Sequence, residues 1–138
     1  MNFVFDIDGT LCFDGRTIHN DILAEIDHLL TQGHEVIFAS ARPIRDIIPV
    51  LPKRFHHFKL VGGNGAFVSH NGNIESISFD EQTKKQLLQF IEENDCTYLA
   101  DCNWNYSFTG DVEHPIYRNL NKIDAKNICP TNSKLPIH

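Results

Sequence analysis

Hydrophobic residues in the first half of the chain gather in short runs that are mostly apolar. Residues 2–7 and 35–40 form two such runs, which are rich in Phe, Val and Ile and too short for helices. Runs of this kind predict strands that are buried on both faces. Between them, apolar residues recur at helical spacing over residues 22–30, with Asn20 as the expected N-cap and Gly33 as the expected stop. Strand, helix and strand in this order predict a parallel pair, the beginning of a doubly wound α/β sheet.

The pattern changes at the glycine-rich stretch 62–65. Beyond it, two short apolar segments flank Asn71-Gly72, a dipeptide typical of tight hairpin turns. Asp80 then predicts the N-cap of a helix whose apolar residues would face inward. A hairpin followed by a helix is typical of antiparallel α+β structure, whereas the earlier strands are predicted to be parallel. We therefore predict an α/β core over residues 1–65 and a partial α+β segment over residues 66–138.

Composition narrows the class of protein. The chain has 138 residues, of which 41% are hydrophobic and 22% charged, and its formal net charge is −6. This acidic balance disfavours a general nucleic-acid partner but does not exclude small phosphorylated molecules. We find no apolar run long enough to span a membrane and no signal peptide. The expectation is therefore a cytoplasmic protein with neither nucleic acid nor membrane as its partner.

The cysteines agree with that expectation. They are scattered without a C-x-x-C pair, at Cys12, Cys96, Cys102 and Cys129. Free thiols in a reducing compartment explain this pattern most simply, and a disulfide or zinc framework is the alternative.

Two carboxylates stand at the end of the first predicted strand, at Asp6 and Asp8. Side chains two positions apart along a strand point the same way, so both acids would face one site. Like charges so close need a neutralising partner, and Mg²⁺ is a hard cation that prefers oxygen ligands. Gly9 permits a sharp turn that brings backbone N–H groups near an anion such as phosphate, and Thr10 adds a hydroxyl. This stretch therefore predicts a site for magnesium and phosphate.

Ser40 ends the second predicted strand. Ligands of open α/β sheets bind outside the carboxyl ends of the strands, which is the edge where Asp6 also falls. A serine hydroxyl there can bind a phosphate oxygen, and Arg42 offers a bidentate donor close by. Each residue also has an ordinary structural explanation, since serine often caps a helix and arginine often lies on the surface. The coincidence of Asp6 and Ser40 at one edge is stronger evidence for a site than either residue alone.

These motifs resemble those of the haloacid dehalogenase superfamily. "FDIDGTL" is similar to the first motif of its phosphatases, D-x-D-G-T, and "FASAR" at residues 38–42 is similar to the second, in which Thr or Ser ends a strand. Asn64-Gly65-Ala66 follows the third predicted strand, an order that resembles the Cof-type sugar-phosphate phosphatases. The resemblance covers roughly the first hundred residues. It implies the first half of a Rossmann-like parallel core, followed by the start of an α+β cap.

The resemblance also implies roles for single residues. Asp6 would be the nucleophile that forms an aspartyl-phosphate, and Asp8 would be the general acid and then the base. Asp6 and the backbone carbonyl of Asp8 would hold Mg²⁺. The substrate phosphate would be bound by residues of both motifs, namely Gly9, Thr10, Ser40, Ala41 and Arg42. The implied activity is hydrolysis of a small phosphorylated metabolite, with sugar phosphates as one candidate class.

The chain departs from the family pattern in more than one place. Ala41 stands where a glycine is usual, and we find neither the lysine nor the Gly-Asp acidic motif that would follow the cap. We therefore expect a fragment of a longer phosphatase, with a minimal capless member as the alternative. The competing functional hypothesis is a non-catalytic chain that keeps the fold for binding or assembly. An unfinished sheet would also expose a strand edge and favour self-association.

Overall fold

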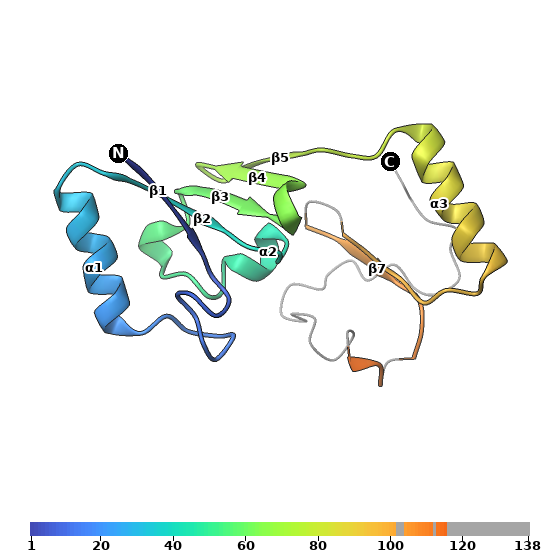
Figure 1. The fold of residues 1–138 in the computed structure, drawn as a ribbon, viewed down its shortest axis with the longest axis horizontal. Coiled ribbons are helices and arrows are strands. Elements are labelled where there is room, and N and C mark those ends of the chain that lie inside the picture. The colour runs from blue at the N-terminus through green and yellow to red at the C-terminus, as the bar shows by residue number, and fades with distance from the viewer. Residues whose placement is uncertain (102–103, 112, 116–138) are drawn as a thin grey trace. The chain divides into compact units, whose positions relative to one another are not determined.

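The computed structural model describes residues 1–101, 104–111 and 113–115, and the chain divides into two compact units, Met1–Ile77 and Ser78–His138. The first unit is a sheet with helices (Figure 1). Its elements are, in chain order, β1 (Asn2–Asp6), α1 (Asn20–Thr31), β2 (Glu35–Ala39), α2 (Ile44–Ile47), β3 (Lys59–Gly62), β4 (Phe67–His70) and β5 (Asn73–Ser76). Short 3₁₀ turns at Lys53–Phe55 and Gly63–Gly65 flank β3.

A five-stranded sheet forms the centre of the first unit, in the order β1-β2-β3-β4-β5. The strands β1, β2 and β3 run parallel, and Asp6 pairs with Ala39, which pairs in turn with Val61. This parallel arrangement, with α1 between β1 and β2, confirms the predicted α/β fold. Because the strands are parallel and in register, the chain leaves β1 and β2 at the same edge of the sheet.

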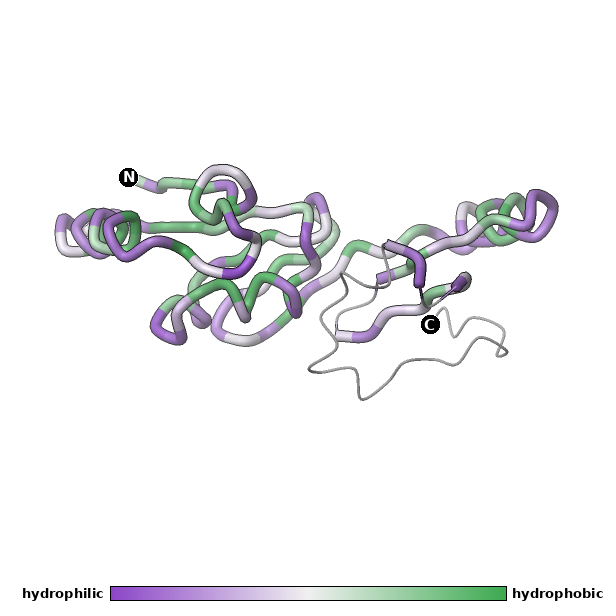
Figure 2. Tube along the Cα trace, turned by 90° about the horizontal axis from the view of Figure 1, so that it is seen from below, coloured by the Kyte–Doolittle hydropathy of each residue, from purple (hydrophilic) through white to green (hydrophobic). Residues whose placement is uncertain are grey.

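Helix α1 packs against the sheet through the apolar positions that predicted it. Ile26 is buried in the core, and the partly buried residues around it are Ile22, Leu23, Leu29 and Leu30. The N-cap is His19 rather than Asn20, because the His19 side chain accepts the Asp21 N–H. Gly33 follows the helix with a φ of +77°, the left-handed conformation that stops a helix. Figure 2 shows hydrophobic and hydrophilic residues mixed along α1, as expected of a helix with one face towards the core.

The hairpin of β4 and β5 belongs to the first unit. β4 pairs antiparallel with β3, with Val61 opposite Val68, so backbone hydrogen bonds join the hairpin to the parallel strands. The predicted boundary between residues 65 and 66 therefore falls inside the sheet, and the first unit extends to Ile77. That the residues after 65 form part of a cap stays a prediction.

One face of the sheet carries exposed apolar residues. Val4 of β1 is 63% exposed and Val68 of β4 is 39% exposed. Their partners in the neighbouring strands are Ile37, which pairs with Val4, and Val61, which pairs with Val68. Ile37 and Val61 are each partly exposed. The two-residue period of the strands places these four side chains on one face, which we call the open sheet face. Parallel sheets are ordinarily covered on both faces, so this face is unusual.

The second unit contains helix α3 (Glu81–Glu93) and a two-stranded antiparallel sheet of β6 (Leu99–Asp101) and β7 (Tyr106–Phe108). Asp80 caps α3 as predicted, since its Oδ1 accepts the Thr83 N–H at 2.8 Å. The prediction that the apolar residues of this helix face inward is wrong, because Leu87 and Phe90 are 42% and 58% exposed. The described strands of this unit are only three residues long and offer little surface against which a helix could pack.

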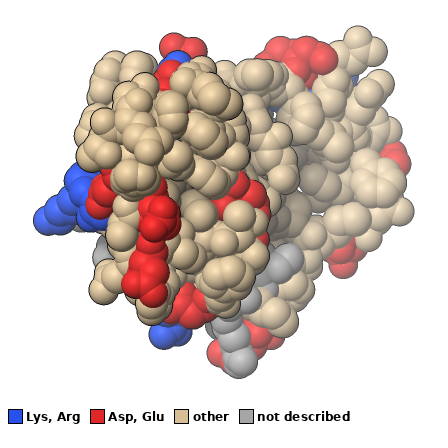
Figure 3. Space-filling view, turned by 60° about the vertical axis from the view of Figure 1, so that its left-hand side comes forward, with Lys and Arg blue, Asp and Glu red and all other residues tan. Residues whose placement is uncertain are grey.

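One face of the molecule carries more acidic than basic side chains. On the face shown in Figure 3, acidic side chains cover more area than basic ones, in keeping with the net charge of −6. None of the helices in the described ranges has the length and apolar character needed to cross a membrane.

Candidate active site

The carboxyl ends of β1 and β2 meet at one edge of the sheet, and the candidate site lies there. β1 ends at Asp6 and β2 at its register partner Ala39, so Ser40 follows directly. The Ser40 N–H donates to the Val61 carbonyl at 2.9 Å, which joins the start of this loop to β3. The structure therefore has Asp6 and Ser40 on neighbouring strands at the same edge.

The chain forms a tight loop directly after β1. The carbonyl of Ile7, whose side chain is buried, accepts the N–H groups of Leu11 at 3.0 Å and Cys12 at 2.8 Å. Gly9 has a φ of +75°, where a side chain would be strained, and its N–H donates to the Cys12 carbonyl at 2.9 Å. Ile7 thus anchors the loop in the core, and the loop sets the direction of Asp8.

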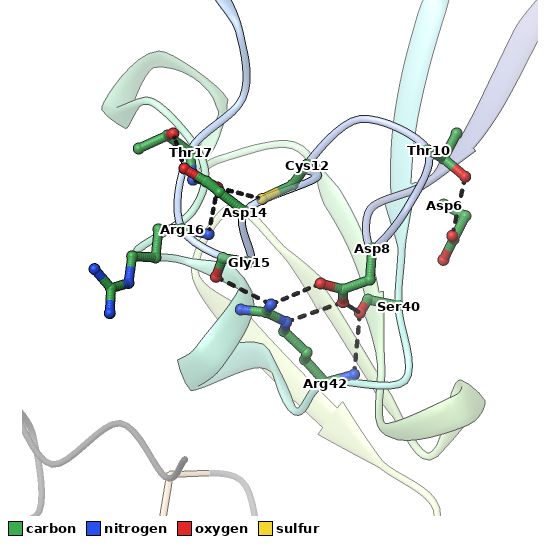
Figure 4. Close-up of polar contacts among 10 residues, drawn as sticks. All are labelled: Asp6, Asp8, Thr10, Cys12, Asp14, Gly15, Arg16, Thr17, Ser40 and Arg42. Carbon is green, nitrogen blue, oxygen red and sulfur yellow. Dashed lines mark hydrogen bonds and ion pairs between the residues drawn. The ribbon is translucent and has the colours of Figure 1, made fainter.

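Asp8 is held by two residues of the loop after β2 (Figure 4). Arg42 donates from Nε to Oδ2 at 2.9 Å and from Nη2 to Oδ1 at 2.6 Å, which makes a bidentate ion pair. The Ser40 hydroxyl donates to the same Oδ2 at 3.2 Å. Asp8 thus accepts three hydrogen bonds, and the bond to Asp8 raises the pKa of Arg42 above its ordinary value.

Asp6 has a different environment. Its Oδ2 accepts a 3.1 Å hydrogen bond from the Thr10 hydroxyl, and the residue is exposed. Figure 4 shows the Asp6 carboxylate beside Thr10 and apart from the group around Asp8. The expected alternation along a strand does not extend to Asp8, because β1 ends at Asp6 and a turn follows. Each acid therefore has its own hydrogen-bond donors.

Asp14 organises the next part of the loop, where the polar residues Asp14-Gly15-Arg16 predict a turn. Its Oδ1 accepts the N–H groups of Arg16 at 2.8 Å and Thr17 at 2.7 Å, and its Oδ2 accepts the Thr17 hydroxyl at 2.7 Å. These donors, Thr17 foremost, hold the pKa of Asp14 below its ordinary value. The Gly15 carbonyl of the same loop accepts Nη2 of Arg42 at 3.1 Å. An Asp whose side chain accepts from the backbone two and three positions later is typical of such a turn.

Most of the predicted phosphate donors already have partners. The Gly9 N–H bonds to Cys12, the Thr10 hydroxyl to Asp6, and the Ser40 hydroxyl to Asp8. Ala41 is exposed beside Ser40 and has no positive φ, so alanine fits the backbone where glycine is usual. Binding of a phosphate by this set requires that some of these hydrogen bonds be exchanged.

The metal prediction rests on few ligands. In the part of the chain that the structure describes, no three His, Cys, Asp or Glu side chains gather into a metal site. The Asp6 carboxylate is nevertheless exposed, has the Thr10 hydroxyl as its hydrogen-bond donor and supplies the hard oxygens that Mg²⁺ prefers. Mg²⁺ usually keeps several waters and takes only one or two protein carboxylates. The residues present therefore fit the ion as part of its coordination shell.

Known proteins are similar to this chain in sequence and in fold. The family model for haloacid dehalogenase-like hydrolases matches residues 3–135. A Streptococcus pyogenes protein, whose phosphatase name is itself inferred, is 28% identical over 95 residues. The 5-amino-6-(5-phospho-D-ribitylamino)uracil phosphatase of Bacillus subtilis is 37% identical over 65 residues. A solved structure from Eubacterium rectale matches with a TM-score of 0.71 at 23% identity, which shows a shared fold.

The matches cover only part of each relative. They span 69% of this chain and 34% of the S. pyogenes protein, and 47% of this chain and 24% of the B. subtilis enzyme. For the E. rectale structure the shares are 85% and 45%. The chain thus spans less than half the length of these relatives. Because the family model covers both motifs and nearly the whole chain, this protein belongs to the haloacid dehalogenase-like hydrolases.

Proposed function

We propose that the site is part of a Mg²⁺-dependent phosphohydrolase that acts on a small phosphorylated metabolite through an aspartyl-phosphate. One observation carries the proposal. An exposed Asp6 carboxylate and an Asp8 carboxylate held by Ser40 and Arg42 both lie where the parallel strands end. Ligands of open α/β sheets bind at this edge. The family supports hydrolysis, and the name of the B. subtilis relative gives a phosphorylated metabolite as its substrate.

In the first step, an Asp6 carboxylate oxygen attacks phosphorus, and the bond from phosphorus to the ester oxygen breaks. The leaving oxygen takes a proton from the Asp8 carboxyl, and the product alcohol departs. The difference between the two acids supports these roles. Asp6 is exposed and bonded to a single hydroxyl, so it can approach phosphorus, whereas three hydrogen bonds fix the orientation of Asp8.

In the second step, water attacks the phosphorus of the aspartyl-phosphate and gives a proton to Asp8. The bond from phosphorus to Asp6 then breaks, and inorganic phosphate leaves. Asp8 loses one proton and regains one, so the cycle balances. Mg²⁺, held by Asp6 and the Asp8 carbonyl, would offset negative charge on the phosphoryl group. Donors for the phosphate would come from Ala41 and, once their present hydrogen bonds are exchanged, from Gly9 and Thr10, while the Ser40 hydroxyl keeps its bond to Asp8.

The test measures Mg²⁺-dependent phosphate release from p-nitrophenyl phosphate. We expect Asp6→Asn to abolish turnover, because an amide does not form the acyl phosphate. Asp27→Asn is the matched control, since it changes a half-exposed acid whose described partner is Arg54. It should keep the wild-type rate. An active chain in which Asp6→Asn turns over at the wild-type rate refutes the nucleophile assignment.

Magnesium binding tests the site without turnover. Titration of Mg²⁺ by calorimetry should give weaker binding for Asp6→Asn than for the wild type, with Asp27→Asn unchanged. Binding that does not depend on Asp6 counts against the proposed metal site.

A non-catalytic role in binding or assembly is the second candidate, and the open sheet face favours it. Val4 and Val68 are exposed on that face, and β1 lies at the edge of the sheet order. Exposed strand edges and apolar patches are usually covered by a partner or by another copy of the chain. A chain that self-associates and binds no Mg²⁺ through Asp6 would support this role over hydrolysis.

A further inference from the structure

The Arg42 guanidinium is directed at protein groups within the site. Nε and Nη2 bind the two oxygens of Asp8 at 2.9 and 2.6 Å, and Nη2 also donates to the Gly15 carbonyl at 3.1 Å. The Arg42 side chain is 27% exposed. A planar guanidinium that binds both oxygens of a carboxylate fixes its direction as well as its charge. The geometry therefore differs from that of an arginine presented to a substrate.

Ser40 holds Asp8 and Arg42 together. Its hydroxyl has one proton, which it donates to Asp8 at 3.2 Å, and its Oγ accepts the backbone N–H of Arg42 at 3.0 Å. Ser40 is buried, so its side chain has little room to move. Asp8 is thus held from two directions by residues of a single loop.

The loop after β1 supports Arg42 from its other side. Asp14 accepts hydrogen bonds from the N–H groups of Arg16 and Thr17 and from the Thr17 hydroxyl. These bonds fix the loop in the conformation that presents the Gly15 carbonyl to Arg42. The Arg42 guanidinium therefore joins the loop after β2, which carries it, to the loop after β1, which supplies its acceptors.

We propose that Arg42 is a positioning residue for Asp8 rather than a ligand of the substrate phosphate, and that the loop at residues 14–17 serves the same purpose. This changes the phosphate-binding role expected from the sequence, and it rests on the proposed function of Asp8 in proton transfer. Asp8 has to present an oxygen to the leaving group and then to water. A carboxylate free to rotate does so in only some orientations, and a bidentate partner removes that freedom.

The first arm of the test needs no turnover. Nitrogen-15 NMR resolves arginine Nε–H groups, and those bonded to a carboxylate exchange slowly with water. We expect a protected Arg42 signal in the wild type and in Asp6→Asn, and loss of protection in Asp8→Asn. Arg54 provides an internal reference, because it binds Asp27 in the same bidentate manner at 3.2 and 2.9 Å. An Arg42 signal that Asp8→Asn leaves unchanged overturns the proposal.

The second arm separates positioning from phosphate binding. For Arg42→Gln we expect kcat on p-nitrophenyl phosphate to fall about 10²-fold, with KM and the dissociation constant of inorganic phosphate changed less than about threefold. Arg42→Lys should regain part of the loss, because it keeps the charge and loses the second hydrogen bond. Arg54→Gln should match the wild type. A rise of about tenfold or more in KM and in the phosphate dissociation constant, at unchanged kcat, identifies a phosphate ligand and overturns the proposal.

The two proposals fail in different ways. If Asp6→Asn keeps the wild-type rate, the nucleophile assignment is wrong, while the Arg42 signal still reports on its pairing with Asp8. If Asp6→Asn abolishes turnover and Arg42→Gln leaves kcat unchanged, only the positioning role is wrong.

Discussion

The N–H of Gly63 donates a 2.8 Å hydrogen bond to the carbonyl oxygen of Arg42, so the turn after β3 is joined to the loop after β2. The neighbouring Gly62 leaves no room for a side chain. A Cβ there would lie 2.7 Å from the Arg42 carbonyl oxygen and 3.1 Å from the Ile44 nitrogen. Both atoms belong to the backbone, which cannot move aside without shifting the loop. The glycine-rich stretch therefore positions Arg42 as well as ending a strand.

Gly62→Ala should disturb the site through this contact. We expect the free energy of unfolding in urea to fall by about 1–3 kcal/mol, because the added methyl overpacks the loop. The Arg42 Nε–H signal should shift with it. Gly65→Ala is the control, since a Cβ there meets no atom within 4 Å and adds only the strain of a φ of +95°. Equal shifts of the Arg42 signal in both variants would contradict this account.

Ser40→Ala should weaken catalysis without breaking the ion pair. Asp8 would keep both bonds from Arg42 but lose the hydroxyl, and the Arg42 N–H would lose its acceptor. We expect kcat on p-nitrophenyl phosphate to fall about tenfold or more, the cost of about one hydrogen bond to a charged group. The Arg42 Nε–H signal should stay protected. Ser69→Ala, at another buried serine, is the control, and a wild-type kcat in Ser40→Ala would speak against the role of the hydroxyl.

Asp14 should make the loop after β1 sensitive to acid. Its pKa is lowered by hydrogen bonds from Thr17 and Arg16, so folding favours its ionised form. This contribution to stability is fully present above the ordinary aspartate pKa of about 3.9 and is lost as pH falls through the lower folded value. Asp14→Asn should therefore unfold at lower temperature than the wild type above about pH 5, with a gap that narrows below about pH 4. Thermal unfolding of both proteins across this pH range tests the prediction. A difference in unfolding temperature that does not change with pH would contradict a stabilising role for the ionised Asp14 carboxylate.

Cys12 should be an unreactive thiol in the folded chain. Burial, foremost, raises its pKa, and the residue lies in the core beside Ile7. The partly exposed Cys96 is the internal comparison. We expect iodoacetamide at pH 8 to alkylate Cys12 at least about tenfold more slowly than Cys96. This difference in rate should disappear in denaturant. Mass spectrometry of the peptides measures both rates, and fast native labelling of Cys12 would contradict its burial.

Val4→Lys tests whether the open sheet face drives self-association. Val4 is exposed on edge strand β1, and a lysine on an edge strand opposes strand pairing and apolar contact. If the wild type associates, we expect the variant to shift towards monomer in sedimentation velocity at equal concentration. Thr31→Lys, on the exposed end of α1, is the charge-matched control. Association that survives Val4→Lys would place the contact elsewhere.

Much of the first unit could be predicted, because its signals are local. Helical spacing located α1, Gly33 located its end, and Asn71-Gly72 located the hairpin turn, with φ values of +52° and +80°. Each of these signals depends on a few neighbouring residues and on their allowed backbone angles. The N-cap of α1 was misplaced by one residue, since histidine is an uncommon cap.

The pairing of the hairpin with β3 could not be predicted in the same way. Sequence pattern identifies a hairpin but not the strand edge it joins, because that choice depends on which backbone groups are left unpaired in space. The boundary predicted between residues 65 and 66 therefore lies between two paired strands, β3 and β4, in which Val61 is opposite Val68.

By itself, the sequence determined which residues stand where the parallel strands end, since apolar runs set the strands and Asp6 and Ser40 close them. Only the tertiary structure decided what those residues face. Arg42 turns to Asp8, 34 positions away, because two loops on adjacent strands bring the guanidinium between a carboxylate and the Gly15 carbonyl. A long, flexible, charged side chain takes its partner from such proximity, and its place in the sequence carries no record of that partner.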